Sequence, residues 1–212
     1  YSASKAAAEI AIASYRDSYF PPEKIGEHKI HIASVRAGNV IGGGDWAEDR
    51  IIPDAVRAVT AGTPLELRSP KAVRPWQHVL EPLSGYLVLA ARMMCGDHCG
   101  VTPLESAWNF GPLPAGTATV LEIVQGFYNV WGSGETKYDP TLVQVPEAAL
   151  LRLSSDKAMN LLGWKSIWNI SETIERTASW YMDYYSHNGD VRERSLRDLV
   201  AYMQEMKTQY AV

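Results

Sequence analysis

The sequence predicts an α/β fold with a helical C-terminal third. Segments with strand patterns and segments with helix patterns alternate along the 212 residues, without internal repeats or low-complexity stretches. A glycine-rich stretch, Gly42-Gly43-Gly44, follows the first strand pattern, and ligands of open α/β sheets bind beyond the carboxyl ends of strands. Hydrophobic residues make up 46% of the chain and charged residues 21%, as in ordinary packed proteins. The length suits one domain or a domain and a half.

The N-terminal half is expected to begin with a helix over residues 4–20, which carries an apolar stripe and stops at Pro21-Pro22. Residues 28–36 alternate and are β-branched, so they indicate a strand. A glycine-rich loop over residues 37–46 is expected next, then a helix over residues 51–61 that ends at Gly62. Three further elements are predicted: short strands at 65–67 and 76–79, and a helix over 80–94.

The second half is expected to contain one more clear strand, residues 107–110, bounded by Gly111-Pro112. Residues 120–131 have a helical pattern, and residues 137–138 a short extended one. A helix within residues 153–162, with Ser154 or Ser155 as its cap, is closed by Gly163. Two amphipathic helices, over residues 170–185 and 195–210, complete the chain.

Composition excludes several classes of function. The net charge is −4 and no basic cluster stands out, so we expect no nucleic-acid partner. No apolar run is long enough to cross a bilayer and no signal peptide is recognisable, so we expect no membrane contact and a cytoplasmic protein. Cys95 and Cys99 lack a second pair of ligands at a finger-like distance, and we interpret them as free thiols rather than a metal site.

The pattern Tyr1-Ser2-Ala3-Ser4-Lys5 carries the strongest chemical signal. Residues four apart on a helix lie on the same face. A cation beside a phenol favours the phenolate, which can take a proton from an alcohol while a hydride leaves the same carbon. Tyr1 and Lys5 are therefore candidate catalytic and cofactor-binding residues. The same spacing also occurs by chance on solvated helices, so the downstream residues have to decide.

Downstream, four short segments follow the Tyr-Lys pair in a characteristic order. They are residues 36–42 (RAGNVIG), 49–53 (DRIIP), 74–79 (RPWQHV) and 108–112 (WNFGP). In this order they resemble the extended short-chain dehydrogenase/reductase family of nucleotide-sugar enzymes. Residues 42–50 and 74–86 look most like the branch of that family that dehydrates CDP-glucose. The resemblance covers nearly the whole chain.

The resemblance implies the C-terminal part of an extended Rossmann-type, NAD(P)-binding fold with a smaller mixed α/β substrate-binding domain. Residues 1–40 and parts of 70–110 would complete the Rossmann-type sheet, and residues 41–69 and 111–212 would form most of the nucleotide-sugar region. The N-terminal dinucleotide-binding half, with its G-x-G-x-x-G turn, is not in the sequence, so we expect this chain alone to be inactive. The implied cofactor is NAD and the implied substrate is CDP-glucose.

The implied reaction is the dehydration of CDP-glucose to CDP-4-keto-6-deoxyglucose in deoxysugar biosynthesis, as for lipopolysaccharide O-antigen. Tyr1 would remove the proton of the sugar O4, and Lys5 would hold the nicotinamide ribose. Carboxyl groups outside this sequence would expel the C6 hydroxyl as water. Two alternatives stay open. One is another dehydratase or an epimerase acting on dTDP-, UDP- or GDP-sugars, and the other is a non-catalytic nucleotide-sugar binding module.

Four of the six candidate substrate-binding residues are polar groups near strand or helix ends. The side chain of Asn39 either reaches a diphosphate or sugar oxygen or bonds its own turn. The guanidinium groups of Arg50 and Arg74 match a phosphate geometrically, and the usual alternative is a surface ion pair. Arg74 is preferred, since Val73 and Pro75-Trp76 flank it. Asn109 is placed to contact the nucleotide, or is a buried strand asparagine.

The roles of the other two candidates are balanced. Asp49 either bonds a sugar hydroxyl or caps the following helix, or does both. His78 either contacts ribose or phosphate or packs within a strand. Trp46 and Trp76 either form a wall of the sugar or base site or belong to the core.

The helix over residues 4–20 has an alanine-rich face that suits the four-helix bundle of related dimers, so a homodimer or homotetramer is expected. The alternative is burial of that face against its own sheet.

Overall fold

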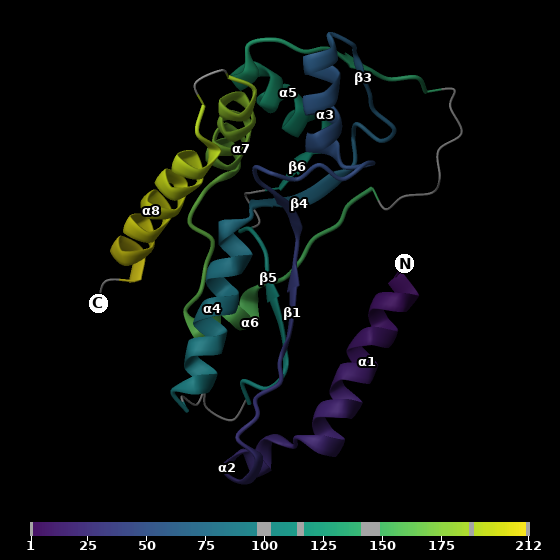
Figure 1. Cartoon of the computed structure of the whole chain (residues 1–212). Helices are drawn as coiled ribbons and strands as arrows, with labels where there is room; N and C mark the ends of the chain where they lie inside the picture. Colours follow the sequence, from purple (N-terminus) through teal and green to yellow (C-terminus); the bar gives the residue numbers. More distant parts are fainter. Residues whose placement is uncertain (1, 97–102, 114–116, 141–148, 187–188, 211–212) are drawn as a thin grey trace. The chain divides into compact units, whose positions relative to one another are not determined.

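The computed structural model describes residues 2–96, 103–113, 117–140, 149–186 and 189–210 (Figure 1). The chain divides into two compact units. Unit 1 comprises Tyr1–Ala37, Leu83–Phe110 and Ser154–Lys165, and unit 2 comprises Gly38–Pro82, Gly111–Leu153 and Ser166–Val212. This division places residues 154–165 with the N-terminal helix and residues 70–82 with the C-terminal helices. Which unit binds cofactor and which binds substrate stays a prediction.

Unit 1 is built around a two-stranded parallel sheet. Strand β1 (Ser34–Ala37) pairs with β5 (Ala107–Phe110), with Ser34 opposite Ala107 and Ala37 opposite Phe110. Helix α6 (Asp156–Leu162) lies beside β5, as Figure 1 shows. The unit also contains α1 (Ser2–Tyr19), the short helices η1 (Pro22–Lys24) and α2 (Ile25–His28), and most of α4 (Leu80–Met94).

Aromatic side chains form the centre of the unit 1 core. The rings of Phe110 and Trp164 meet edge to face, with their centroids 5.0 Å apart. Trp108 is fully buried, and its indole N–H donates to the carbonyl of Leu104 at 2.8 Å. Gly85 of α4 lies so close to Phe110 that a Cβ there would fall 2.1 Å from the ring. Glycine is therefore required where α4 crosses β5.

Unit 2 contains a three-stranded mixed sheet with the strand order β2-β4-β6. Strand β2 (Asn39–Ile41) runs parallel to β4 (Val73–His78), and β6 (Thr117–Thr119) runs antiparallel to it. A separate parallel pair is formed by β3 (Leu65–Glu66) and β7 (Thr136–Lys137). The helices are α3 (Ile51–Ala61), α5 (Val120–Trp131), α7 (Ile170–Tyr185) and α8 (Val191–Tyr210).

The unit 2 core lies between the sheet and helices α3, α5 and α7. Val56, Ile123, Phe127 and Tyr181 contribute fully buried side chains from these helices. Local signals fix the helix ends: Thr119 and Glu122 form a reciprocal capping box at the start of α5. These caps leave the apolar faces of the helices free to pack.

Most elements agree with the sequence-based expectation, and five helices and strands have the expected bounds: 51–61, 80–94, 107–110, 120–131 and 170–185. The strand expected at 28–36 is wrong in its first half, because residues 25–28 are helical and only Ser34–Ala37 pairs with a neighbour. His28 holds this turn, with its ring bonded to the carbonyl of Pro21 and the amide of Ile30, both at 3.1 Å.

Three further expectations need correction. Residues 39–41 of the expected glycine-rich loop form β2, because β4 offers a partner strand that only the fold supplies. Strand β6 was not expected, and α8 begins at Val191 rather than at residue 195, since the carboxylate of Asp190 accepts from the amides of Arg192 and Glu193. At α6 the N-cap residue Ser155 makes no side-chain capping hydrogen bond, whereas the hydroxyl of Ser154 accepts from the amide of Asp156 at 3.4 Å.

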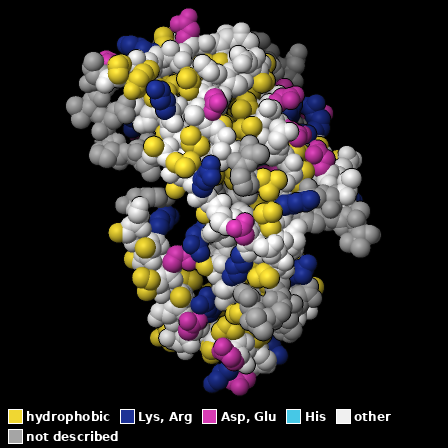
Figure 2. Space-filling model, turned by 180° about the vertical axis from the view of Figure 1, so that it is seen from behind, with side chains coloured by type: hydrophobic (Ala, Val, Ile, Leu, Met, Phe, Trp, Pro, Cys, Tyr) yellow, Lys and Arg dark blue, Asp and Glu magenta, His cyan; other side chains and the backbone are white. Residues whose placement is uncertain are grey.

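The surface carries no large area of one charge on the face shown in Figure 2, where basic and acidic side chains are interspersed. Among the described residues, none of the helices combines the length and the apolar character needed to cross a bilayer. The same residues include no cluster of three or more metal-ligating side chains. Cys95 is an exposed free thiol, and Cys99 lies outside the described residues.

Candidate functional site

The candidate residues are distributed over both units. Lys5 and Asn109 belong to unit 1, and the other described candidates belong to unit 2. Lys5 is exposed on α1, while Tyr1 lies outside the described residues. The geometry of the Tyr-Lys pair therefore stays a prediction.

Asn39 is the first residue of β2 and follows the end of β1 after a single glycine. It lies opposite Trp76 of β4 and is half-buried. The intervening Gly38 is forced by close packing, because a Cβ there would lie 2.4 Å from the carbonyl oxygen of Pro75. The close approach of Gly38 to Pro75 and the pairing with Trp76 hold Asn39 beside β4 of the same unit.

Strand β4 carries Arg74, Trp76 and His78 at alternate positions, so their side chains share one face of the strand. Arg74 is 6% exposed and donates a hydrogen bond to the carbonyl of Val73 at 2.9 Å. Trp76 is buried in the unit 2 core, and its indole N–H donates to the carbonyl of Ala118 at 3.1 Å. The sequence left two roles open for Trp76, a ligand wall or core packing, and the structure shows core packing.

His78 ends β4 and is buried, with 5% of its surface exposed. Its Nδ1 accepts from the amide of Leu80 at 3.3 Å, and its ring meets Trp168 at a centroid distance of 4.8 Å. Burial lowers the pKa of His78 to about 4, and Arg176 and Arg194 act in the same direction against the opposing charge of Asp198. The ring is therefore neutral at physiological pH, and its described contacts are those of a packed strand residue.

Asp49 and Arg50 lie in the exposed loop before α3. Arg50 is the N-cap residue of α3 and makes no side-chain cap, so Asp49 is not the cap that the sequence suggested. Asp49 has a left-handed backbone with φ of 59° and forms an ion pair with Arg68. Both side chains are about three-quarters exposed, at 76% and 75%. A pair this exposed contributes little to stability, and its groups are accessible to a ligand.

Asn109 lies in β5, opposite Arg36 of β1. Its amide nitrogen donates to the carbonyl of Ser154 at 3.0 Å. Its amide oxygen is buried and accepts no hydrogen bond from any described residue. A buried acceptor without a donor is unfavourable in the protein alone, so this oxygen is suited to a donor from outside.

Sequence reasoning missed the buried carboxylate of Glu81. It accepts from the amides of Ile167 and Trp168, the latter at 2.7 Å, and from the hydroxyl of Tyr202 at 2.8 Å. Burial raises the pKa of Glu81 to about 6, although these three hydrogen bonds act in the opposite direction. The sequence contains no signal for this role, because a glutamate in the first turn of a helix is ordinarily a solvated residue.

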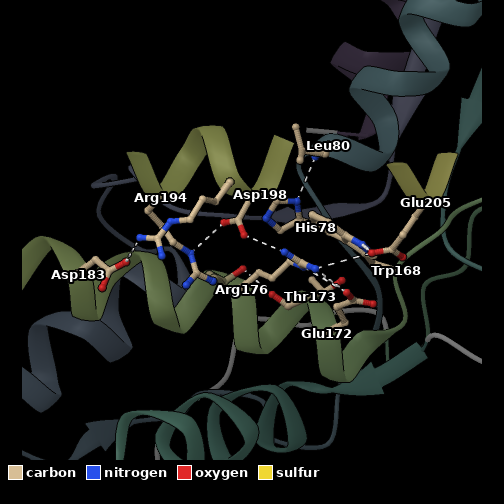
Figure 3. Close-up of polar contacts among 12 residues, drawn as sticks. His78, Leu80, Trp168, Glu172, Thr173, Arg176, Asp183, Arg194, Asp198 and Glu205 are labelled. Atoms are coloured by element: carbon tan, nitrogen blue, oxygen red, sulfur yellow. Dashed lines mark hydrogen bonds and ion pairs between the residues drawn. The ribbon is translucent and has the colours of Figure 1, made fainter. Parts of the chain in front are cut away.

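A second missed feature is the ion-pair network that joins α7 and α8 (Figure 3). Arg176 donates to Asp198 at 2.9 Å and to Glu172 at 2.8 Å. Arg194 donates to the other oxygen of Asp198 at 3.2 Å. The guanidinium of Arg176 also lies over the ring of Trp168, 4.0 Å from its centroid. Through Trp168 the network reaches His78 at the end of β4.

The loop after β2 is held against α7. Gly43 touches the ring of Trp180 so closely that a Cβ there would fall 2.0 Å from it. Tyr181 accepts from the amide of Asp45 and donates to its carbonyl, at 3.1 and 2.6 Å. Trp46 is 40% exposed beside Tyr184, with a centroid distance of 4.9 Å. Because the ring of Trp46 is partly exposed, it could still form a wall of a sugar or base site, which is one of the two roles that the sequence suggested.

Comparison with known proteins shows sequence similarity to a family model and to a curated relative. Residues 1–100 match the model of the NAD dependent epimerase/dehydratase family. The chain is 39% identical over 203 residues to the CDP-glucose 4,6-dehydratase of Salmonella typhimurium. The aligned region covers 96% of this chain and 55% of the relative. The chain thus spans about half the length of the curated relative that it matches.

Solved structures share the fold. A dTDP-glucose 4,6-dehydratase from Bacillus anthracis in complex with NAD matches with a TM-score of 0.66 and 21% identity, over 86% of this chain and 51% of that one. A UDP-glucose 4-epimerase from Thermus thermophilus matches with a TM-score of 0.65 and 23% identity, over 86% and 53%. Together with the parallel strand pairs, these matches show the Rossmann-type α/β fold, and over residues 1–100 the chain is similar to the NAD dependent epimerase/dehydratase family.

Proposed function

We propose that this chain is part of an NAD-dependent nucleotide-sugar 4,6-dehydratase, a hydro-lyase that converts CDP-glucose to CDP-4-keto-6-deoxyglucose. The observation that carries the proposal is the 39% identity to a CDP-glucose 4,6-dehydratase over 96% of the chain. The family model that matches residues 1–100 spans the Tyr1–Lys5 pattern and the segments around Asn39 and Arg74.

In this proposal Tyr1 and Lys5 act at the sugar C4 position. Tyr1 would take the proton of the O4 hydroxyl, and Lys5 would favour the phenolate and hold the nicotinamide ribose. The exposed position of Lys5 on α1 fits contact with a bound nucleotide. NAD, when bound, would accept the hydride from C4 and return it to C6.

The remaining candidates would bind the nucleotide sugar. The buried amide oxygen of Asn109 can accept a hydrogen bond from a ligand hydroxyl or amine. Arg74 presents a guanidinium fork in a largely desolvated position on β4, where a contact with a diphosphate would be strong. Asn39, Asp49 and Arg50, which lie at a strand end or in the loop before α3 of unit 2, would add further contacts in this proposal. For His78 the packing role is the better supported, and a ribose contact is the lesser alternative.

A UDP-sugar or dTDP-sugar epimerase or dehydratase is the second candidate, favoured by the likeness in fold to a UDP-glucose 4-epimerase. A non-catalytic nucleotide-sugar binding module is the third. We also propose a cytoplasmic homodimer or homotetramer that uses α1, since no residue of that helix is buried and Ile10 is 71% exposed.

The test is a mass-spectrometric assay of the natural reading frame that contains this chain. CDP-glucose, dTDP-glucose and UDP-glucose are offered separately with NAD. Loss of one water from CDP-glucose alone supports the proposal, and Tyr1→Phe should then abolish the loss. Conversion of a sugar without loss of water would favour the epimerase. Binding without conversion of any sugar would favour the binding module.

The contribution of this chain is tested on the chain as it is, by titration calorimetry with CDP-glucose. Arg74→Lys keeps the positive charge but removes the planar fork, so affinity should fall about tenfold. Arg152→Lys is the matched control, because Arg152 is an exposed arginine outside the proposed site. An unchanged affinity in Arg74→Lys would remove Arg74 from the site.

A further inference from the structure

Helix α8 has an inner face fixed to the rest of unit 2. Tyr202, 3% exposed, donates to the buried Glu81, and Asp198, 6% exposed, accepts from Arg176 of α7. Figure 3 shows Asp198 between the two arginines that bind it. These contacts fix the rotation of α8 about its own axis, so its other face is presented in a defined orientation.

The opposite face of α8 carries an exposed apolar stripe, here called the outer stripe. It consists of Leu196, Leu199, Val200 and Met203, whose exposed fractions are 50%, 40%, 52% and 49%. Met206, half-buried, continues it by three residues. Four large apolar side chains exposed together on one helix face indicate an interaction surface rather than scattered surface residues.

The spacing within the outer stripe is that of a coiled-coil seam. Leu196, Leu199, Met203 and Met206 alternate by three and four residues, as the a and d positions of a heptad do. Val200 then occupies an e position beside the seam. A seam of this kind takes another helix as its partner, with side chains packed as knobs into holes.

We propose that the outer stripe binds the same stripe of a second copy of this chain, with the two α8 helices antiparallel. Antiparallel packing places each a residue opposite a d residue. Leu196 then faces Met206 of the partner subunit, and Leu199 faces Met203 of the partner subunit. The two-fold axis passes close to Val200, which lies beside its own copy, so the contact is isologous and closes on itself.

Charge selects this orientation. Glu193 and Lys207 are exposed and lie seven residues before and after Val200. In the antiparallel pair each Glu193 therefore lies opposite Lys207 of the partner subunit, in the flanking e positions. In a parallel pair in register the e positions lie on opposite sides of the seam, so Glu193 and Lys207 would not meet and this charge complementarity would be lost.

The inference does not depend on the proposed enzymatic function. The seam is short, about 15 Å from residue 196 to residue 206 at the rise of an α-helix, so the contact belongs to the small and reversible class. We expect self-association that depends on concentration in the micromolar range and that is independent of CDP-glucose and NAD.

The experiment is sedimentation velocity of the whole chain over a concentration series. At high concentration Val200→Glu should have half the weight-average mass of the unmodified chain, because it places two carboxylates at the axis. Val200 is half-exposed, so this change leaves the fold intact, which circular dichroism checks. Met94→Glu, an exposed residue at the end of α4, is the control and should keep the mass of the unmodified chain.

A charge exchange tests the orientation. Glu193→Lys and Lys207→Glu should each raise the dissociation constant roughly tenfold, and the double exchange should restore it. Equal masses for the unmodified chain and Val200→Glu at every concentration would overturn the proposal. A double exchange weaker than both single ones would overturn the antiparallel arrangement. Binding of α8 to anionic vesicles in place of self-association would assign the outer stripe to a membrane and would also overturn it.

Discussion

The hydroxyl of Tyr202 donates a hydrogen bond of 2.8 Å to the carboxylate of Glu81, which joins α8 to the start of α4. The same carboxylate accepts from the amides of Ile167 and Trp168 at the approach to α7. One fully buried acid thus connects three segments that are far apart in the sequence. Together with the ring contact of His78 and Trp168, this group holds the C-terminal helices to the strand that carries Arg74 and His78.

Glu81→Gln should therefore destabilise the chain by about 2–3 kcal/mol, because one oxygen that accepts hydrogen bonds becomes an amide that faces donors. Thermal or urea unfolding measures the loss. The exposed Glu66→Gln is the matched control, with an expected change below about 0.5 kcal/mol. Equal stabilities of the two variants would contradict the role of Glu81 as a clamp.

Two buried groups should give opposite pH dependences of stability. The pKa of Glu81 in the fold is about 6, above its ordinary value of 4.5. The folded state therefore holds this proton more tightly, and its contribution to stability is present below pH 4.5 and lost as the pH rises through about 6. The expected size is about 2 kcal/mol.

His78 acts in the other direction, because its pKa in the fold is about 4 against an ordinary 6.5. Its contribution is present above pH 6.5 and lost as the pH falls towards 4, by about 3 kcal/mol. Unfolding free energies measured from pH 4 to 7 should rise more steeply with pH in Glu81→Gln than in the unmodified chain. In His78→Asn the rise should be smaller. Parallel curves for all three proteins would disprove both assignments.

Gly85→Ala tests the contact of α4 with β5. An alanine inside a helix ordinarily stabilises it by about 0.5–1 kcal/mol relative to glycine. At position 85 the added Cβ would fall 2.1 Å from the ring of Phe110, so a loss of about 2 kcal/mol or more is expected. Gly26→Ala, in α2 with no heavy atom within 4 Å of the added Cβ, is the control and should be neutral or stabilising. Similar melting temperatures for the two variants would count against the close packing.

Arg176→Lys keeps the charge of the α7–α8 network but removes its planar fork. It should lose the stack on Trp168 and one of the two carboxylate contacts, and cost about 1–2 kcal/mol. Arg197→Lys is the control, since the side chain of Arg197 is 61% exposed. Urea unfolding compares the two. No difference between them would show that the network contributes charge alone.

Asp49→Ala separates a binding role from a structural one. Because the ion pair of Asp49 with Arg68 is exposed, the unfolding free energy should change by less than about 0.5 kcal/mol. If Asp49 bonds a sugar hydroxyl, the dissociation constant for CDP-glucose should rise up to about tenfold in calorimetry. An unchanged constant would exclude that contact.

Hydrophobic periodicity and helix- or strand-end signals in the sequence were sufficient to predict the bounds of five helices and strands. The bounds of α3, α4, β5, α5 and α7 were predicted because each carries a local pattern and local stop signals such as Gly62. Strands β2 and β6 were not predicted, because three residues are too few for a periodic signal and exist as strands only beside β4. For the candidate site, the order of the motifs in the sequence identified the candidate residues, but it did not predict which residues surround them.

The sequence by itself determined the likeness to the epimerase/dehydratase family, the helical C-terminal third and the residue types of the candidate site. Only the tertiary structure decided that Trp76 is a core residue, that His78 is neutral and that Glu81 clamps α7 and α8. The physical reason is that burial and partner contacts depend on residues brought together from 42 positions apart, as Trp76 and Ala118 are, or from 87, as Glu81 and Trp168 are. Local patterns encode which helix or strand forms, whereas the charge state and the contacts of a side chain depend on what the fold packs around it.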